Sequence, residues 1–206
     1  MFNFFGKKKH MERSNKWIFG TMLAFGIVGL IASFILAVEK IHLLQNPEAV
    51  LSCSFNLVVN CSTVMQTWQS SLFGFPNMYI GLMAYPVVIT VAVSGLMGVR
   101  FPRAFLIAAN SCYLLGAIFA YWLLFQSVYV IEVLCPWCLI VTFATTILLA
   151  TITHYNLREN TFNFSKSANK VVQKYLEKDI SKLITASWIV IMIALILVKF
   201  GESLFA

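Results

Sequence analysis

Two cysteines separated by two residues, Cys135 and Cys138, stand at the front of a long apolar run in the sequence Cys-Pro-Trp-Cys. Because proline is favoured at the first position of a helix, Pro136 predicts that Cys135 is the N-cap and Cys138 the third helical residue. Unpaired backbone N–H groups and the helix dipole favour a thiolate at both sulfurs. Since the thiolate is the species that attacks a disulfide, this spacing indicates a redox-active dithiol.

A second pair, Cys53 and Cys61, lies in the polar stretch 39–75, with seven residues between the two cysteines. Two pairs on one side of a membrane, the arrangement that the composition and charge distribution of this chain predict, suggest a relay. Electrons would enter at the loop pair and pass by thiol–disulfide exchange to the pair at the helix start. A lipid-soluble quinone fits as the final acceptor, because the sequence has no glycine-rich fingerprint for a flavin and no His pair with the spacing of haem ligands.

Three other roles stay open for these cysteines. They could bind zinc, although the spacing of Cys53 and Cys61 is long for a zinc site, and we expect no metal. They could form two inert disulfides, but a two-residue spacing closes a tight ring that is usually redox-labile. They could also be unpaired core cysteines, which is uncommon beside water on an oxidising side. The fifth cysteine, Cys112, falls in an apolar segment, where we expect a small packing residue.

The composition requires a membrane. Of the 206 residues, 60% are hydrophobic and only 11% are charged, and the mean hydropathy is +0.82. No soluble domain of this size can hide so much apolar surface in its own core. The apolar runs predict an all-α integral membrane protein with five transmembrane helices, at about residues 17–38, 77–99, 104–126, 135–154 and 183–200.

Positive charges are distributed unevenly between the two sides. Five Lys and Arg lie in the leader 1–16, two in the turn after the second span and six in 155–182, which leaves only Lys40 and Lys199 for the other side. The positive-inside rule therefore predicts a cytoplasmic N-terminus. Both cysteine pairs then lie on the outer face, where disulfides form and persist in bacteria. This distribution explains the net charge of +7 without nucleic-acid binding.

Lysines recur at every fourth position before the fifth span, at 166, 170, 174, 178 and 182. This spacing forms a basic stripe on a helix that could lie along an anionic lipid surface. The lysines could dock a partner protein, or they could simply mark the cytoplasmic side of the membrane. The positive-inside rule favours the second interpretation.

The order of these motifs resembles the vitamin K epoxide reductase (VKOR) family, and its bacterial branch most closely. The resemblance covers about residues 17–154. It rests on the Cys-x7-Cys loop, on Phe-Gly-Phe-Pro-Asn at 73–77 followed by Gly81 and Tyr85, and on Cys-x-x-Cys opening the fourth span. Quinone reductases of the DsbB type carry Cys-x-x-Cys in the first outer loop instead.

The resemblance implies a four-helix, quinone-binding redox domain with an outer loop, followed by a linker and a fifth helix. The expected boundaries are a cytoplasmic leader at 1–16, the redox domain at 17–154 with its loop at 39–75, a basic cytoplasmic linker at 155–182 and the fifth transmembrane helix at 183–206.

The resemblance also implies a role for each cysteine. Cys138 would react with the quinone, and Cys135 would be its resolving partner and exchange with Cys61. Cys53 would receive electrons from an outer thioredoxin-like (DsbA-like) thiol oxidase through a transient mixed disulfide. Many bacterial relatives carry such a domain fused after the fifth span. Because this chain stops at Ala206, we expect its client to be a separate protein.

Candidate quinone contacts follow from the same resemblance. Asn77 aligns with the family's asparagine that hydrogen-bonds a quinone carbonyl, and an amide donor there could stabilise negative charge on the quinone oxygen. An ordinary N-cap of the second span explains Asn77 nearly as well. Met65 and Phe75, together with Trp68 and Phe73, could wall the ring, although aromatic residues are expected at a membrane interface in any case.

Thr142 stands where vertebrate members of the family carry a tyrosine. Thr142 could still donate a hydrogen bond to the quinone, but its shorter reach favours plain quinone reduction over a vitamin K epoxide substrate. We therefore expect a quinone-dependent thiol oxidase in a bacterial cell (inner) membrane, with ubiquinone or menaquinone as acceptor. The alternatives are a vitamin K-type epoxide reductase and a non-enzymatic membrane protein with structural disulfides.

Overall fold

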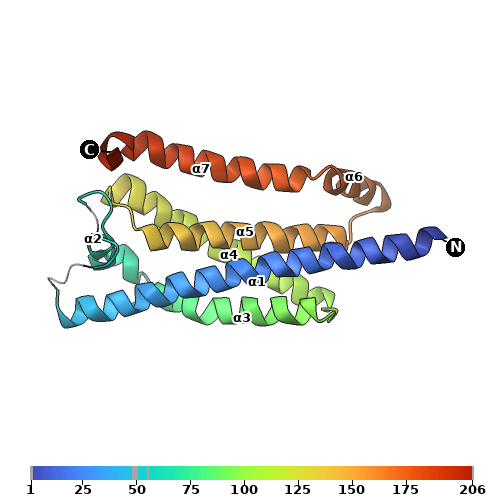
Figure 1. Ribbon diagram of the computed structural model, residues 1–206, viewed down its shortest axis with the longest axis horizontal. Coiled ribbons are helices and arrows are strands. Elements are labelled where there is room, and N and C mark those ends of the chain that lie inside the picture. The colour runs from blue at the N-terminus through green and yellow to red at the C-terminus, as the bar shows by residue number, and fades with distance from the viewer. Residues whose placement is uncertain (1, 48–50, 55, 206) are drawn as a thin grey trace.

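The computed structural model describes residues 2–47, 51–54 and 56–205, with side chains between residues 15 and 201 of these ranges (Figure 1). Within them the backbone forms isolated β-bridges but no strand. The all-α prediction is confirmed. The helices are, in chain order, α1 (Phe2–Gln45), α2 (Cys61–Gln66), the 3₁₀ helix η1 (Trp68–Ser71), α3 (Met78–Leu96), α4 (Arg103–Gln126), the π turn η2 (Ser127–Ile131), α5 (Pro136–Arg158), α6 (Lys166–Glu177) and α7 (Ile180–Phe205).

Five helical stretches in the described chain are long and apolar enough to cross a membrane, which confirms the five predicted spans. In Figure 1 they run side by side along the long axis of the molecule, with α2 at one end and α6 at the other. The stretches are Asn15–Gln45, Met78–Leu96, Arg103–Ile131, Pro136–Arg158 and Ile180–Gly201.

The first helix is longer at both ends than the sequence predicts. The leader expected at 1–16 is already helical from Phe2, and the first span continues from 38 to Gln45. The polar connection therefore begins at Asn46 and not at Glu39. The helix ends here because proline disfavours helical backbone in the residue before it, and Pro47 follows Asn46.

The connections around the fourth span are also shorter than predicted. α4 continues through η2 to Ile131, so only residues 132–134 precede Cys135. Glu132 closes the π turn in the left-handed region, with φ 56. The linker expected at 155–182 contains the last turn of α5 and the whole of α6.

Helices α1, α3, α4 and α5 form a bundle in which α1 packs against α3 and α5, and α4 packs against α5. Small residues let α1 and α3 approach closely. A Cβ at Gly29 would lie 2.2 Å from the Tyr85 ring, and a Cβ at Gly81 would lie 2.2 Å from Ser33 Oγ. Such contacts are typical of helices that pack inside membranes. α7 contacts α5 from outside this bundle (Figure 1).

Candidate active site

Three of the four cysteines in the two pairs meet at the α2 end of the bundle. Cys53 and Cys61 form a disulfide with their Cα atoms 5.6 Å apart. The thiol of Cys135 lies 3.3 Å from Cys61 Sγ. Only 2%, 0% and 1% of the surfaces of Cys53, Cys61 and Cys135 are exposed. This arrangement lets a thiolate on Cys135 attack the disulfide at Cys61.

A backbone bridge between two loops brings these sulfurs together. Val59 pairs with Leu134 in an isolated parallel β-bridge. The N–H of Asn60 donates to the carbonyl of Leu134 at 3.0 Å, and the N–H of Leu134 donates to the carbonyl of Val58 at 2.7 Å. Asn60 and Leu134 each directly precede a cysteine, so the bridge sets the separation of the cysteines that follow.

The start of α5 has the geometry that Cys-Pro-Trp-Cys predicts. Cys135 is the N-cap in extended conformation, and Pro136 is at the start of the helix. The Cys138 thiol lowers the pKa of Cys135 below its ordinary value, and the backbone N–H groups of Cys138 and Trp137 act in the same direction. Burial opposes this shift without reversing it. Cys135 is therefore the sulfur at which a thiolate is favoured.

Two charged residues at the end of α1 hold the loop disulfide in place, and sequence reasoning did not identify either. Glu39 is buried and accepts hydrogen bonds from the hydroxyl and the backbone N–H of Ser52, the residue before Cys53. Lys40 Nζ donates to the carbonyl of Met65 at 2.7 Å, in the last turn of α2. The available signal was a Glu-Lys pair directly after a long uncharged run, since charges at the end of a membrane span are rarely placed without partners.

The C-terminal end of α7 supports the loop that precedes Cys135. Lys199 Nζ lies 2.7 Å from Glu132 Oε1, and this ion pair lowers the pKa of Glu132 below its ordinary value. Phe200 packs with Leu134 in a buried cluster that also includes Val58. α7 therefore contacts both sides of the bridge between the cysteine loops.

A cavity of about 550 Å³ lies inside the bundle beside the cysteines. Its walls are mostly apolar, and it extends from Cys135 and Cys138 to Leu148 on α5. α3 and α4 scarcely touch one another, and residues of both helices line the space between them. Its volume is in the range of small-molecule sites.

Three of the six predicted quinone contacts line this cavity: Met65, Asn77 and Thr142. Trp68, Phe73 and Phe75 do not line it. Phe75 stacks on Phe73, with the ring centroids 6.2 Å apart. Phe73 in turn contacts Phe119, which does line the cavity.

Asn77 occupies the N-cap position of α3, but its side chain does not cap the helix. Nδ2 donates to the carbonyl of Gln69 at 2.7 Å, and Oδ1 is buried without a hydrogen-bond partner. The simple capping role is therefore wrong. A buried unpartnered polar atom beside an apolar cavity is the feature expected where a polar ligand group binds. Nδ2 retains a second hydrogen for a quinone carbonyl, while Oδ1 can accept from a hydroxyl.

Gln69 is a further polar residue of the cavity that sequence reasoning missed. It is buried, and its Nε2 donates to Gln126 Oε1 at 3.4 Å; both residues line the cavity. Nothing in the local sequence distinguishes Gln69 from the neighbouring polar residues of a loop.

Thr142 is buried on α5, one turn after Cys138, and its hydroxyl donates to the Cys138 carbonyl at 2.9 Å. The next turn continues this pattern, because Thr146 Oγ1 donates to the carbonyl of Thr142 and contacts Tyr121 Oη at 2.7 Å. Trp188 of α7 donates to the same Tyr121 oxygen. A polar chain thus connects α7 with the turn that carries Cys138.

Cys112 lies on α4, where it is exposed and contributes to the cavity wall. Its expected role as a small packing residue stays a prediction. Among the described residues, no three His, Cys, Asp or Glu side chains gather as metal ligands.

Comparison with protein families identifies the family of this chain. The sequence profile described as the Vitamin K epoxide reductase family matches residues 21–153, a segment that contains both cysteine pairs and most of the cavity. No curated protein matches the chain. The chain therefore belongs to the vitamin K epoxide reductase family, whose members are membrane oxidoreductases with quinone-linked disulfide or epoxide chemistry.

Proposed function

We propose that this protein is a quinone-dependent thiol oxidase that reoxidises a separate thioredoxin-like, disulfide-forming protein. One observation carries the proposal. Cys135 Sγ lies 3.3 Å from Cys61, and Cys135 and Cys138 both line the cavity. Thiol–disulfide exchange therefore has a short path from the loop pair to a site that accommodates a quinone.

The first step reduces the loop pair. A thiolate of the reduced partner attacks Cys53, which breaks the Cys53–Cys61 disulfide and releases Cys61 as a thiolate. The second thiol of the partner then attacks the mixed disulfide. The partner leaves with a disulfide, and Cys53 and Cys61 keep its two electrons as a dithiol.

The second step moves these electrons to the start of α5. The Cys61 thiolate attacks Cys135 in a Cys135–Cys138 disulfide and releases Cys138. Cys53 then attacks Cys61, which restores the loop disulfide and frees Cys135. A loop disulfide beside two free thiols, as found here, is the bonding pattern expected after this step.

The last step reforms the Cys135–Cys138 disulfide beside the cavity. Bound ubiquinone or menaquinone supplies the acceptor for two electrons and two protons. Met65 would contact the ring, and Asn77 and Thr142 would orient it through hydrogen bonds. The lowered pKa of Cys135 favours its thiolate form, which is the better leaving group when Cys53 regenerates the loop disulfide.

The partner has to reach a buried sulfur. Cys53 is only 2% exposed, so the loop around it must open before a mixed disulfide can form. We place this encounter on the outer face of a bacterial cell membrane, because thirteen of the fifteen Lys and Arg lie in segments predicted for the opposite side. A Cys61→Ala variant, which cannot resolve a bond to Cys53, should retain the partner covalently and allow its identification.

The proposal is tested by mixing the purified protein with quinone and a reduced thioredoxin-like protein and following quinone absorbance. Wild type should reduce quinone, and Cys138→Ala should not. Thr151→Ala, on the same helix but outside the cavity lining, is the matched control and should remain active. Undiminished quinone reduction by Cys138→Ala would rule out the mechanism.

The alternative of purely structural disulfides is tested by a redox titration. A relay pair should equilibrate with thiol buffers at the potentials of catalytic dithiols, whereas structural disulfides resist reduction.

A further inference from the structure

We propose that α6 is a membrane-surface anchor that binds the headgroups of anionic phospholipids. α6 lies outside the segment 21–153 that matches the VKOR family, and the redox relay does not use it. The proposal therefore stands independently of the proposed function.

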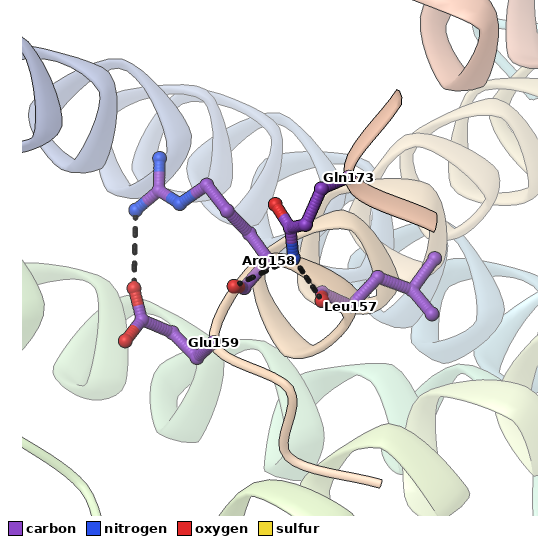
Figure 2. Close-up of polar contacts among 4 residues, drawn as sticks. All are labelled: Leu157, Arg158, Glu159 and Gln173. Carbon is purple, nitrogen blue, oxygen red and sulfur yellow. Dashed lines mark hydrogen bonds and ion pairs between the residues drawn. The ribbon is translucent and has the colours of Figure 1, made fainter. Parts of the chain in front are cut away.

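The neighbours of α6 hold it at the membrane boundary. Only residues 178–179 separate α6 from the span that begins at Ile180. Figure 2 shows that Gln173, in the middle of α6, reaches the end of the preceding span: Nε2 donates to the carbonyls of Leu157 (3.3 Å) and Arg158 (3.2 Å). These contacts tie α6 to the last turn of α5.

The surface of α6 away from this contact includes an apolar strip. Gln173 and the neighbouring Val172 and Leu176 are partly covered by the protein. Val171 and Tyr175 lie one turn apart on another side of the helix, and 53% and 54% of their surfaces are exposed. An apolar strip this close to two spans is positioned to enter the headgroup region of the bilayer.

Exposed lysines border this strip. Segment 166–182 contains five lysines and two acidic residues, which gives it a net charge of +3. Asp179 pairs with Lys182 at 2.7 Å, while Glu177 lies on the lysine side of the helix and reduces its charge. The three lysines within α6, Lys166, Lys170 and Lys174, are exposed, and Lys174 lies one turn from Val171 beside the strip. Phosphate groups of anionic lipids complement this combination of positive charge and apolar strip.

Amide hydrogen exchange of the full-length protein tests the proposal in two kinds of lipid bilayer disc. One kind contains phosphatidylglycerol mixed with phosphatidylcholine, and the other contains phosphatidylcholine alone. We expect amides in 166–177 to exchange more slowly with phosphatidylglycerol, by about fivefold for each lysine that contacts a headgroup. High salt should reduce this difference, because it screens surface charge.

Two matched variants distinguish the effect of positive charge from an effect on folding. Replacing Lys166, Lys170 and Lys174 together by Gln should abolish the dependence on phosphatidylglycerol, whereas replacing all three by Arg should preserve it. Exchange in α7 serves as the internal control for folding.

Equal protection of α6 in both kinds of disc would overturn the headgroup claim in favour of apolar insertion alone. If α6 is unprotected from exchange in both kinds of disc, it is a solvated surface, and the proposal is overturned entirely. Because quinone reduction is not measured, failure here would leave the redox proposal intact.

Discussion

The backbone N–H of Asn60 donates a hydrogen bond to the carbonyl of Leu134 at 3.0 Å, and a cysteine of the proposed relay directly follows each of these residues. The bond joins the loop that carries Cys61 to the loop that carries Cys135. Their sulfurs lie 3.3 Å apart as a result. Contact between the two pairs is therefore built into the backbone and supported from outside by Lys199 and Phe200 of α7.

Asn60→Ala should loosen this junction. The side chain of Asn60 caps α2, because Oδ1 accepts from the N–H of Thr63 (3.2 Å) and from the hydroxyl of Ser54 (2.9 Å). Loss of such a cap costs about 1 kcal/mol, so we expect a lower Tm and slower exchange between Cys61 and Cys135. Thermal unfolding and disulfide-exchange rates measure both effects. Asn60→Asp keeps the acceptor and should behave as wild type; equal losses in the two variants would argue against the capping role.

The reactivity of Cys135 should depend on Cys138. The Cys138 thiol is the main group that lowers the pKa of Cys135 below its ordinary value of 9.0. Since the thiolate is the reactive form, Cys135 in wild type should reach half-maximal alkylation at a lower pH than in Cys138→Ala. Mass spectrometry of the peptide that contains Cys135, across a pH series, gives both midpoints. Identical midpoints would show that Cys138 does not stabilise the thiolate.

Gly29→Ala should disturb the packing of α1 against α3. The added Cβ would lie 2.2 Å from the Tyr85 ring. Overpacking of this kind lowers the free energy of unfolding by about 1–3 kcal/mol. Gly20→Ala, on the same helix, is the control because its Cβ would meet nothing within 4 Å. Thermal unfolding in detergent should show a lower Tm for Gly29→Ala alone. Similar effects of the two substitutions would point to helix propensity and away from packing.

Asn77→Leu should impair the quinone step more than the exchange between cysteines. Loss of one hydrogen bond of about 1 kcal/mol corresponds to a decrease of several-fold in kcat/KM for quinone. Exchange between the loop pair and Cys135, measured without quinone, should stay near the wild-type rate. Equal impairment of both steps would indicate that Asn77 mainly supports the fold through Gln69.

Much of the fold was predictable because local signals are strong in this chain. Uninterrupted apolar runs identified all five spans, and Pro136 identified the first turn of α5. The extension of α1 to Gln45 was not predictable from local sequence. Glu39 and Lys40 remain helical while their side chains bind Ser52 and Met65, residues that are distant in the sequence.

The site was predictable in its chemistry and only partly in its geometry. The spacing of the cysteines indicated two dithiols, but Cys61 and Cys135 are 74 positions apart, and their approach depends on a backbone bridge between the two loops. Phe75 was expected at the quinone, yet its ring stacks outside the cavity. Sequence alone does not distinguish an aromatic residue that lines a cavity from one at a membrane interface, because both positions favour the same residue types.

The most direct test of the central claim is disulfide mapping of the double variant Cys53→Ala/Cys138→Ala. In this variant Cys61 and Cys135 have lost their partners in their own pairs, and their sulfurs lie 3.3 Å apart, so a mild thiol oxidant should join them in a Cys61–Cys135 bond. Peptide mapping without reduction should therefore recover Cys61 linked to Cys135. Recovery of both cysteines as thiols, across the potentials at which the wild-type loop pair equilibrates, would contradict the relay.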